Sequence, residues 1–294
     1  MNQASRPALF GPVISACALL VGVFHLLIVG GVLVLSTMEI RIIHLALMMV
    51  ILFVGHDTRY PWLTGLIPAL LAAAIGIYFL SRWRAIALSG GDTNSMDLYV
   101  GVTLLALVLE AARRSIGLIL AAITSVFLVY PFVSPFLPGV FEGRGVSANR
   151  VANFLTTTTE GVYGIPLGVA ATYIIMFSLY GAFLNQFGAG DFFFRIASKV
   201  TTGMRAASAK TAVIFSSLLG MISGSAAGNV AVTGSFTIPM MKKEGYEPRQ
   251  AAAIEAVVST GGQILPPIMG SAAFIMAEIV GTPYVNIMKA ALVP

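Results

Sequence analysis

The stretch from Thr211 to Met241, TAVIFSSLLGMISGSAAGNVAVTGSFTIPMM, decides the fold. Two apolar runs, residues 211–222 and 230–241, flank a polar centre of sequence Ser223-Gly224-Ser225-Ala226-Ala227-Gly228-Asn229. As a helix, each run rises about 18 Å at about 1.5 Å per residue, but the hydrocarbon core of a bilayer is about 30 Å thick. Neither run can cross alone, and one continuous helix of about 46 Å would need a steep tilt.

The charges around this stretch favour a helical hairpin that enters and leaves the membrane on one side. Basic residues precede it and follow it: Arg195, Lys199, Arg205 and Lys210 on one flank, Lys242, Lys243 and Arg249 on the other. Short basic segments prefer the cytoplasmic side, and a single crossing would place one cluster outside. We therefore predict a re-entrant helical hairpin over residues 211–241. Irregular backbone at membrane depth survives only inside protein or along a wet cavity, so the polar tip is a candidate binding site.

The same segment permits a second interpretation. Gly220, Gly224 and Gly228 recur at every fourth position, which is also the small-residue pattern that lets two helices pack closely. Under this alternative the glycines serve packing alone.

The composition is that of a membrane protein with several spanning segments. The chain of 294 residues is 57% hydrophobic and only 10% charged, with a mean hydropathy of +0.91, which is outside the range of soluble domains. Its basic residues cluster near the ends of apolar segments, so they indicate topology and lipid headgroups rather than nucleic acid. We therefore predict an all-α polytopic protein, a transmembrane helix bundle embedded in a lipid bilayer.

The apolar segments fall into two regions. Up to residue 140 they are rich in Leu and Val and predict spans at about residues 9–35, 40–55, 62–80, 97–112 and 115–137. A polar connection then precedes a sixth span at about 161–187, after which Gly, Ser and Thr become frequent. We place a domain boundary near residue 140. We also expect a short amphipathic helix from Ser147 and an amphipathic arm at the membrane surface over residues 191–209.

A second interrupted helix follows the hairpin. The pattern is helical over residues 249–260 and again over 268–280, and Gly261-Gly262-Gln263-Ile264-Leu265-Pro266-Pro267 separates the two parts. Proline removes a backbone donor and clashes with the preceding turn, so this segment predicts a broken span.

The hairpin tip and the break together supply oxygen ligands for a cation. Ser225 and Asn229 offer side-chain oxygens, while Gly261, Gly262 and Ile264 offer carbonyls that the break frees from helix bonding. Hard oxygen ligands without a carboxylate suit Na⁺ better than a divalent metal. These five residues are the predicted sodium site, and a proline kink that only packs against its neighbours is the alternative.

Three motifs in this region resemble a known family. They are residues 224–230 (GSAAGNV), residues 233–241 (TGSFTIPMM), and residues 255–278 with Ser259-Thr260-Gly261-Gly262-Gln263 and Pro266-Pro267. They resemble the fused membrane permease of tripartite ATP-independent periplasmic (TRAP) transporters, most closely the type paired with TAXI-class binding proteins. Residues 109–114 (LEAARR) and 161–168 are similar to the same family.

The resemblance implies an organisation and a function. Residues 1–140 would be a small-subunit-like helical region, and residues 141–294 the first half of a large, DctM-like transport domain. The protein would lie in the bacterial inner membrane and import a carboxylate-bearing solute, delivered by a periplasmic TAXI-type binding protein, by a sodium-driven elevator motion. The five oxygen ligands would form the first sodium site, and Ser223, Ser225 and Thr260 would contact the substrate. Apart from Na⁺ as the coupling ion, no cofactor is implied.

One departure from the family pattern matters. The family's transport domain has two inverted repeats, each with a hairpin and a broken helix, and this chain contains one such set. We therefore expect the chain to be the front half, without a second sodium site and half of the substrate contacts.

Two other functions fit the same features. Glu255 and Glu278 lie within spans, where ionisable residues are functional by default, so a proton-coupled carrier is one alternative. A non-transporting assembly subunit is the other, because the second repeat is missing. We predict no enzymatic activity, since no catalytic triad, metal cluster or phosphate loop occurs at a plausible spacing. His25 and His44 lie in apolar spans and are interpreted as satisfied polar residues rather than ligands.

Overall fold

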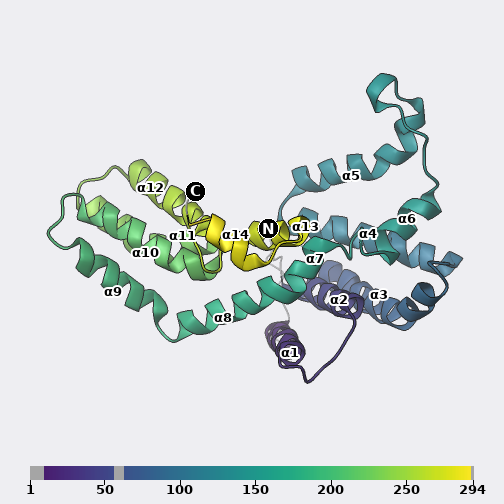
Figure 1. Cartoon of the computed structure of the whole chain (residues 1–294), viewed down its shortest axis with the longest axis horizontal. Helices are drawn as coiled ribbons and strands as arrows, with labels where there is room; N and C mark the ends of the chain where they lie inside the picture. Colours follow the sequence, from purple (N-terminus) through teal and green to yellow (C-terminus); the bar gives the residue numbers. More distant parts are fainter. Residues whose placement is uncertain (1–9, 56–62, 293–294) are drawn as a thin grey trace. The chain divides into compact units, whose positions relative to one another are not determined.

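A computed structural model describes residues 10–55 and 63–292 (Figure 1). The described residues form helices, joined by turns, and contain no β-strand. They divide into two compact units, residues 1–171 and 172–294. The all-α fold predicted from the sequence is therefore confirmed.

The first unit contains the long apolar helices of the N-terminal part. They are α1 (Phe10–Val29), α2 (Thr37–Gly55), α3 (Leu63–Leu88), α4 (Ser95–Ser115) and α5 (Leu118–Val133), followed by the short helices η1 (Ser134–Phe136), η2 (Gly139–Phe141), α6 (Ala148–Thr157) and α7 (Ile165–Val169). Six helices of the described residues are long and apolar enough to cross a membrane: Gly11–Val29, Thr37–Gly55, Thr64–Leu88, Ser95–Ser115, Leu118–Phe136 and Ile165–Gln186. They coincide with the six spans predicted from hydropathy. The short helix predicted from Ser147 is α6, and the Ser147 hydroxyl accepts the N–H of Arg150 as its N-cap.

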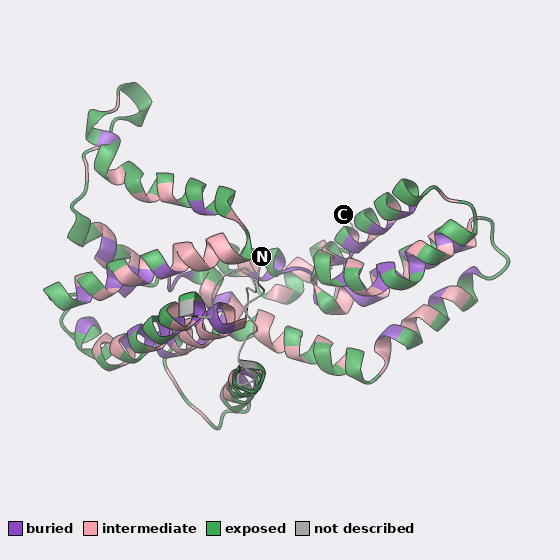
Figure 2. Ribbon diagram, turned by 180° about the vertical axis from the view of Figure 1, so that it is seen from behind, coloured by how far each residue is buried: buried purple, intermediate pink, exposed green. Residues whose placement is uncertain are grey.

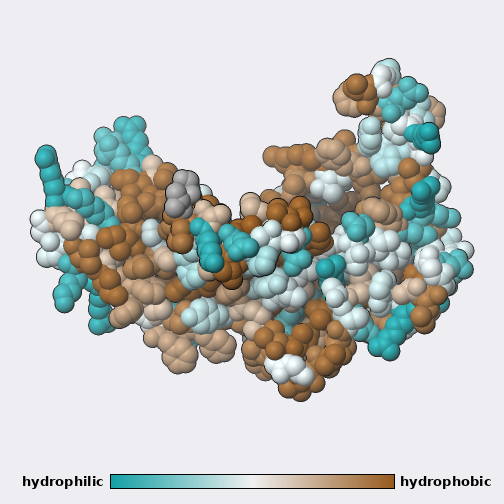
Figure 3. Space-filling view, viewed as in Figure 1, coloured by the Kyte–Doolittle hydropathy of each residue, from teal (hydrophilic) through white to brown (hydrophobic). Residues whose placement is uncertain are grey.

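The core of the first unit lies between α2, α3 and α4. Ile42, Phe53, Phe79 and Leu104 are almost fully buried there, whereas the outer faces of the helices remain exposed and apolar (Figures 2 and 3). Apolar side chains on an outer face are expected where lipid replaces water. This distribution, with apolar residues both in the core and on the outer faces, is that expected of helices surrounded by lipid.

Polar groups in these helices are paired with one another. Asp97 accepts Arg82 at 3.0 Å and the Tyr78 hydroxyl at 2.7 Å, and Glu110 accepts both Arg113 and Arg114 at 2.7 Å. Each partner satisfies a charge that would otherwise be costly near the membrane.

The two histidines of this unit are bonded to each other. His25 donates from Nδ1 to the carbonyl of Val21 at 2.7 Å, because a carbonyl only accepts, and its Nε2 lies 3.0 Å from Nδ1 of His44. Both rings are buried. His25 and His44 are thus satisfied polar residues, as the sequence indicated.

The second unit holds the hairpin and the helices on either side of the predicted break. Its helices are α8 (Ile175–Gln186), α9 (Ala189–Thr201), α10 (Ala207–Ser223), α11 (Ala226–Lys243), α12 (Pro248–Gly261), η4 (Gly262–Ile264), α13 (Ser271–Val280) and α14 (Tyr284–Ala290). A π-helical turn, η3 (Ala170–Ile174), connects α7 to α8. The amphipathic arm predicted over residues 191–209 is α9 together with the turn that follows it.

The hairpin consists of α10 and α11, which pack along each other and against α12 (Figure 1). Its ends are held together at the base, where the carboxylate of Glu244 accepts the backbone N–H groups of Ala207 (3.2 Å) and Ser208 (2.8 Å) and the Ser208 hydroxyl. Hydrophilic side chains gather at this end of the unit (Figure 3). The helical hairpin predicted from segment length and charge is present, and its entry and exit on one side of the membrane stay a prediction.

Two details of the prediction need correction. The tip is Gly224 and Ser225 alone, because α10 runs to Ser223 and α11 begins at Ala226. Asn229, predicted within the tip, lies in the first turn of α11. The arms are also longer than the apolar runs, because flanking alanines and lysines continue each helix.

The compact units do not divide where the composition changes. The division falls between residues 171 and 172, within the span Ile165–Gln186, rather than near residue 140. The assignment of residues 1–140 as small-subunit-like and 141–294 as half of a transport domain stays a prediction.

Candidate functional site

The hairpin tip packs on the break that follows α12. Gly224 has φ +60°, a left-handed conformation that closes α10, and a Cβ at this position would collide with the carbonyl oxygen of Met269. The N–H of Ile268 donates to the carbonyl of Met221 in α10 at 3.2 Å. The two interruptions predicted from the sequence therefore meet in space.

A second close approach lies one turn below the tip. A Cβ on Gly220 would lie 2.7 Å from Cα of Gly262 and 3.0 Å from Nδ2 of Asn229. Only two glycines let the backbones of α10 and η4 come this near. Gly220 thus serves packing, as the alternative interpretation of the glycine pattern proposed, while Gly224 forms the turn of the hairpin.

Asn229 is the most enclosed polar group at this junction. Its side chain is 0% exposed, and Nδ2 donates to the backbone carbonyl of Ser216 in α10 at 2.9 Å. That bond fixes the orientation of the amide, since a carbonyl only accepts. Oδ1 is then buried without a hydrogen-bond partner among the described residues. A buried acceptor in this state is costly, so the geometry suits a cation or a water molecule at Oδ1.

The break changes the partners of the carbonyls beside it. In a continuous helix, the carbonyls of Gly262 and Gln263 would accept from residues 266 and 267, which are prolines without an N–H. Gly262 instead accepts a long bond of 3.4 Å from Leu265, and Gln263 accepts from Gly270 at 2.6 Å. The N–H of Ile268, which would reach Ile264 in a continuous helix, is bonded to Met221. The break therefore releases the Ile264 carbonyl from α-helical bonding to Ile268 and leaves Gly262 weakly bonded.

The five predicted cation ligands are not equally placed. Asn229 and Gly262 are buried and adjacent, since a Cβ on Gly262 would lie 3.5 Å from Asn229 Nδ2. Gly261 ends α12 and is partly buried, and Ile264 is exposed. Ser225 is exposed and its hydroxyl accepts the Gly228 N–H at 3.2 Å as the N-cap of α11.

The three predicted substrate contacts share an exposed position but no common cavity. Ser223 lines a cavity of about 220 Å³ between α8 and the hairpin, with Ser178 and Asn185 in the same wall. Ser225 and Thr260 are exposed and do not line it, and the Thr260 hydroxyl donates to the Ala256 carbonyl at 2.7 Å.

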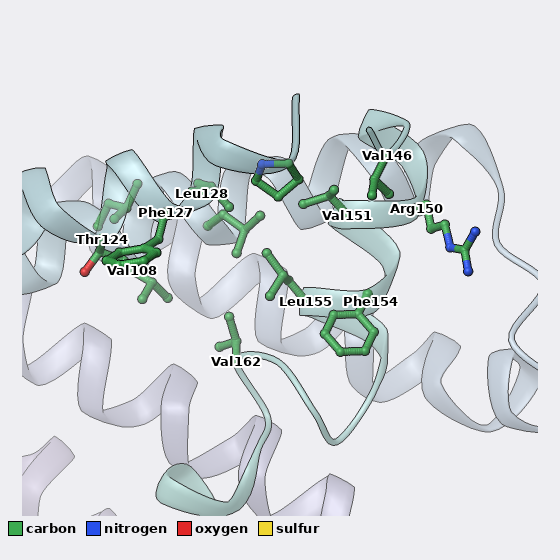
Figure 4. Close-up of a pocket in the computed structure, with 13 residues that line it drawn as sticks. Val108, Thr124, Phe127, Leu128, Val146, Arg150, Val151, Phe154, Leu155 and Val162 are labelled. Atoms are coloured by element: carbon green, nitrogen blue, oxygen red, sulfur yellow. The ribbon is translucent and has the colours of Figure 1, made fainter. Parts of the chain in front are cut away.

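A cavity of the first unit lies elsewhere and has a different character. It measures about 570 Å³ and lies between α4, α5 and α6 (Figure 4). Its walls are apolar except for Thr124 and Arg150, and none of the predicted site residues lines it.

A buried carboxylate with hydroxyl partners lies near Asn229. The sequence analysis named Glu255 for the proton-coupled alternative but did not predict its hydroxyl partners or its place beside the sodium site. Glu255 in α12 is 0% exposed and accepts hydroxyls from three helices: Ser216 in α10, Thr233 and Thr237 in α11, and Ser259 in α12. A signal for it exists in the sequence, because Asn229, Thr233 and Thr237 recur at every fourth position and form one polar stripe on α11. Glu278, the other acidic residue considered for proton transfer, is exposed on α13.

Comparison with known proteins places these features in a family. The family model described as "Tripartite ATP-independent periplasmic transporter, DctM component" matches residues 103–294. The match therefore begins within α4, upstream of the boundary predicted near residue 140. No solved structure matches the chain.

Two curated relatives share part of the sequence. "Uncharacterized protein y4mL" of Sinorhizobium fredii is 29% identical over 140 residues, which is 48% of this chain and 33% of the relative. "Uncharacterized protein YgiK" of Salmonella typhimurium is 29% identical over 100 residues, 34% of this chain and 23% of the relative. The chain thus spans only a third or less of the relatives it matches.

The family match covers most of the chain, including the hairpin, its tip and the broken helix that packs on it. On this ground the chain belongs to the DctM family, the membrane permease components of tripartite ATP-independent periplasmic transporters.

Proposed function

We propose that this chain is the membrane part of a sodium-coupled TRAP transporter that imports a carboxylate-bearing solute. One observation carries the proposal. The buried Oδ1 of Asn229 lacks a partner among the described residues at the point where the hairpin meets the helix break. A buried oxygen acceptor in that setting suits a monovalent cation, and the weakly bonded carbonyl of Gly262 belongs to the same junction.

The predicted ligand set fits Na⁺ in chemical type. Asn229 Oδ1 and the carbonyls of Gly261, Gly262 and Ile264 are neutral, hard oxygen atoms, and Ser225 adds a hydroxyl at the tip. A divalent ion would favour carboxylate ligands. When bound, the ion would join α11 to the end of α12 and so stabilise one arrangement of the hairpin against the break.

The tip also offers a place for the solute's carboxylate. The N-terminus of α11 carries the positive end of the helix dipole, which favours anions. Ser223, Ser225 and Thr260 carry exposed hydroxyls, and the Thr260 hydroxyl would have to leave the Ala256 carbonyl to donate to a solute. These residues are our candidates for substrate contact, and an elevator motion of the second unit is the transport mechanism we propose.

The remaining parts of the proposal concern partner and location. The sequence motifs at the tip resemble the permeases that work with periplasmic TAXI-type binding proteins, so we propose such a protein as the source of the solute. The family and the six apolar helices make the chain a multi-pass bacterial membrane protein, and the inner membrane is the location we propose.

The test is uptake by the full-length protein reconstituted in liposomes with its periplasmic binding protein. We expect uptake to require an inward sodium gradient and to decline when Asn229 is replaced by alanine. Uptake that is independent of Na⁺ but abolished by Glu255→Gln with Glu278→Gln would favour the proton-coupled alternative. A protein that binds neither ion nor solute would favour the assembly role.

A further inference from the structure

Glu255 is a buried carboxylate enclosed by hydroxyl groups. Ser216 donates to it at 2.9 Å, Ser259 at 2.8 Å and Thr237 at 2.5 Å, and Thr233 is a fourth donor. A carboxylate accepts hydrogen bonds, and these four hydroxyls lie within donor distance of its two oxygens. The side chain is fully buried between α10, α11 and α12.

The negative charge has no positive partner in the described part of the chain. The ion pairs found there involve Glu39, Asp97, Glu110 and Glu247. The charged groups carried by α10 to α12 and the turns at their base are all exposed: Arg205, Lys210, Lys242, Lys243, Glu244, Glu247 and Arg249. Hydroxyl groups solvate a carboxylate but do not neutralise it, and a buried charge is costly without a counter-ion.

The carboxylate is linked to Asn229 through two residues. Ser216 donates its hydroxyl to Glu255 and accepts the Asn229 amide with its backbone carbonyl. Thr233 bonds to Glu255, and its hydroxyl also lies 2.8 Å from the Asn229 carbonyl. Ser216 and Thr233 therefore each bridge Asn229 and the buried carboxylate.

We infer that Glu255 is the counter-charge of the cation bound at Asn229 Oδ1, where the hairpin meets the helix break. The inference rests on the proposed function and adds the group that balances the charge of one bound monovalent cation. The five proposed sodium ligands are all neutral, so a bound Na⁺ would carry a net positive charge into the membrane. One buried carboxylate balances one monovalent ion, and their attraction is strong because the surroundings have a low dielectric constant. Glu255 is a positioning residue in this scheme, because it acts on the ion through Ser216 and Thr233.

The variant Glu255→Gln removes the charge and keeps the shape. It is expected to fold, because three of the hydroxyls have a second acceptor within reach. Ser216 can turn to Thr233 Oγ1 at 3.0 Å, Thr233 to the Asn229 carbonyl, and Thr237 to the Thr233 carbonyl at 3.0 Å. The glutamine amide can then donate to a hydroxyl that has turned away.

The experiment measures equilibrium binding of radioactive Na⁺ to the purified full-length protein, without solute. We expect Glu255→Gln to weaken binding about tenfold or more and Glu255→Asp to restore part of it. Glu278→Gln removes the same charge from an exposed position of α13 and is expected to bind Na⁺ normally. Thr237→Val removes one hydroxyl and keeps the carboxylate, so its Na⁺ affinity should stay close to that of the unaltered protein.

Three outcomes decide between the possibilities. Loss of affinity in Glu255→Gln alone, with uptake recovered at saturating Na⁺, supports a counter-charge. Normal binding by Glu255→Gln, or an equal loss in Thr237→Val, overturns the inference and leaves the sodium site in place. An unaltered protein that binds no Na⁺ refutes the proposed function itself.

Discussion

Asn229 in α11 donates its side-chain amide to the backbone carbonyl of Ser216 in α10, at 2.9 Å across the hairpin. This bond ties the two arms just below the tip and leaves Oδ1 buried without a partner in the described residues. The orientation of one amide therefore presents an acceptor to the junction between hairpin and helix break.

Replacing Asn229 by alanine should weaken Na⁺ binding. The change removes Oδ1 and leaves the Ser216 carbonyl without its donor, at a cost of about 1–3 kcal/mol in the free energy of unfolding for a buried polar group. The Na⁺ concentration for half-maximal uptake is expected to rise about tenfold. Ser235→Ala is a matched control, because Ser235 is exposed on the same helix and bonds only to the nearby Val232 carbonyl among the described contacts. An equal effect in both variants would contradict a specific role for Asn229.

Replacing Gly220 by alanine should separate the hairpin from the break. The added methyl group would lie 2.7 Å from Gly262 Cα, and relief of such overpacking typically costs about 1–3 kcal/mol. We expect a lower melting temperature in detergent and a smaller stabilisation by added Na⁺. Gly261→Ala is the control, since no atom lies within 4 Å of a Cβ there. If Gly261→Ala were as unstable as Gly220→Ala, crowding at Gly262 would not be the cause.

Lys210 and Lys242 should face the same compartment. Glu244 binds the N-terminus of α10, so the start of α10 and the end of α11 lie together at the base of the hairpin. Single cysteines at these positions, in a variant whose only cysteine, Cys17, is replaced by serine, should both react with an impermeant thiol reagent from one side of oriented vesicles. Reaction from opposite sides would mean that residues 207–243 cross the membrane, and the proposed site would not exist.

The base of the hairpin should loosen in acid. Hydrogen bonds from the Ser208 hydroxyl, then from the backbone N–H groups of Ser208 and Ala207, hold the pKa of Glu244 below its ordinary value of 4.5. A lowered pKa means that the bonds contribute to stability fully above pH 4.5 and that the contribution is lost as the pH falls through the lowered pKa. A cysteine placed at Lys210 is exposed briefly to each pH and its reaction with the thiol reagent is then measured. We expect this reaction to become faster at pH values below the pKa of Glu244.

Two variants test this assignment of the acid response. When Glu244→Gln is added to Lys210→Cys, the cysteine should react at every pH, so the dependence of its reaction on pH should disappear. In Glu247→Gln it should persist, because Glu247 is exposed and pairs with Arg249 instead. A response that survives in Glu244→Gln would assign it to another group.

Much of the fold follows from segment lengths. A hairpin is predicted where two apolar runs are each too short to cross and basic residues lie at both outer ends. Membrane thickness excludes a separate crossing by each run, and the charges favour both ends on one side. The predicted tip, residues 223–229, is longer than the observed one, because polarity alone does not distinguish a turn from the first turn of a helix. Ser225 caps the next helix, and the two alanines that follow it favour a helix, so Asn229 is helical although its own side chain is polar.

The setting of Glu255 could not be predicted in the same way. Its donors come from α10, α11 and α12, and their meeting depends on how each helix is rotated about its own axis, which hydropathy does not specify. His25 and His44 illustrate the same limit, since their bond joins two helices whose facing sides are both apolar in composition. Spacing of four residues between Asn229, Thr233 and Thr237 marks the polar face, but it does not identify the partner.

The hydroxyl groups around Glu255 also have a mechanical consequence. Apolar packing is not directional, so contacts between apolar side chains alone resist the sliding of one helix along another less than hydrogen bonds do. An axial slip of one residue, about 1.5 Å, would pull Thr233 and Thr237 away from the carboxylate together. The depth of the Gly224–Ser225 turn relative to the end of α12 is therefore set by these directional bonds together with the close contact of Gly220 with Gly262, and a solute seated there would be held at one height within the unit.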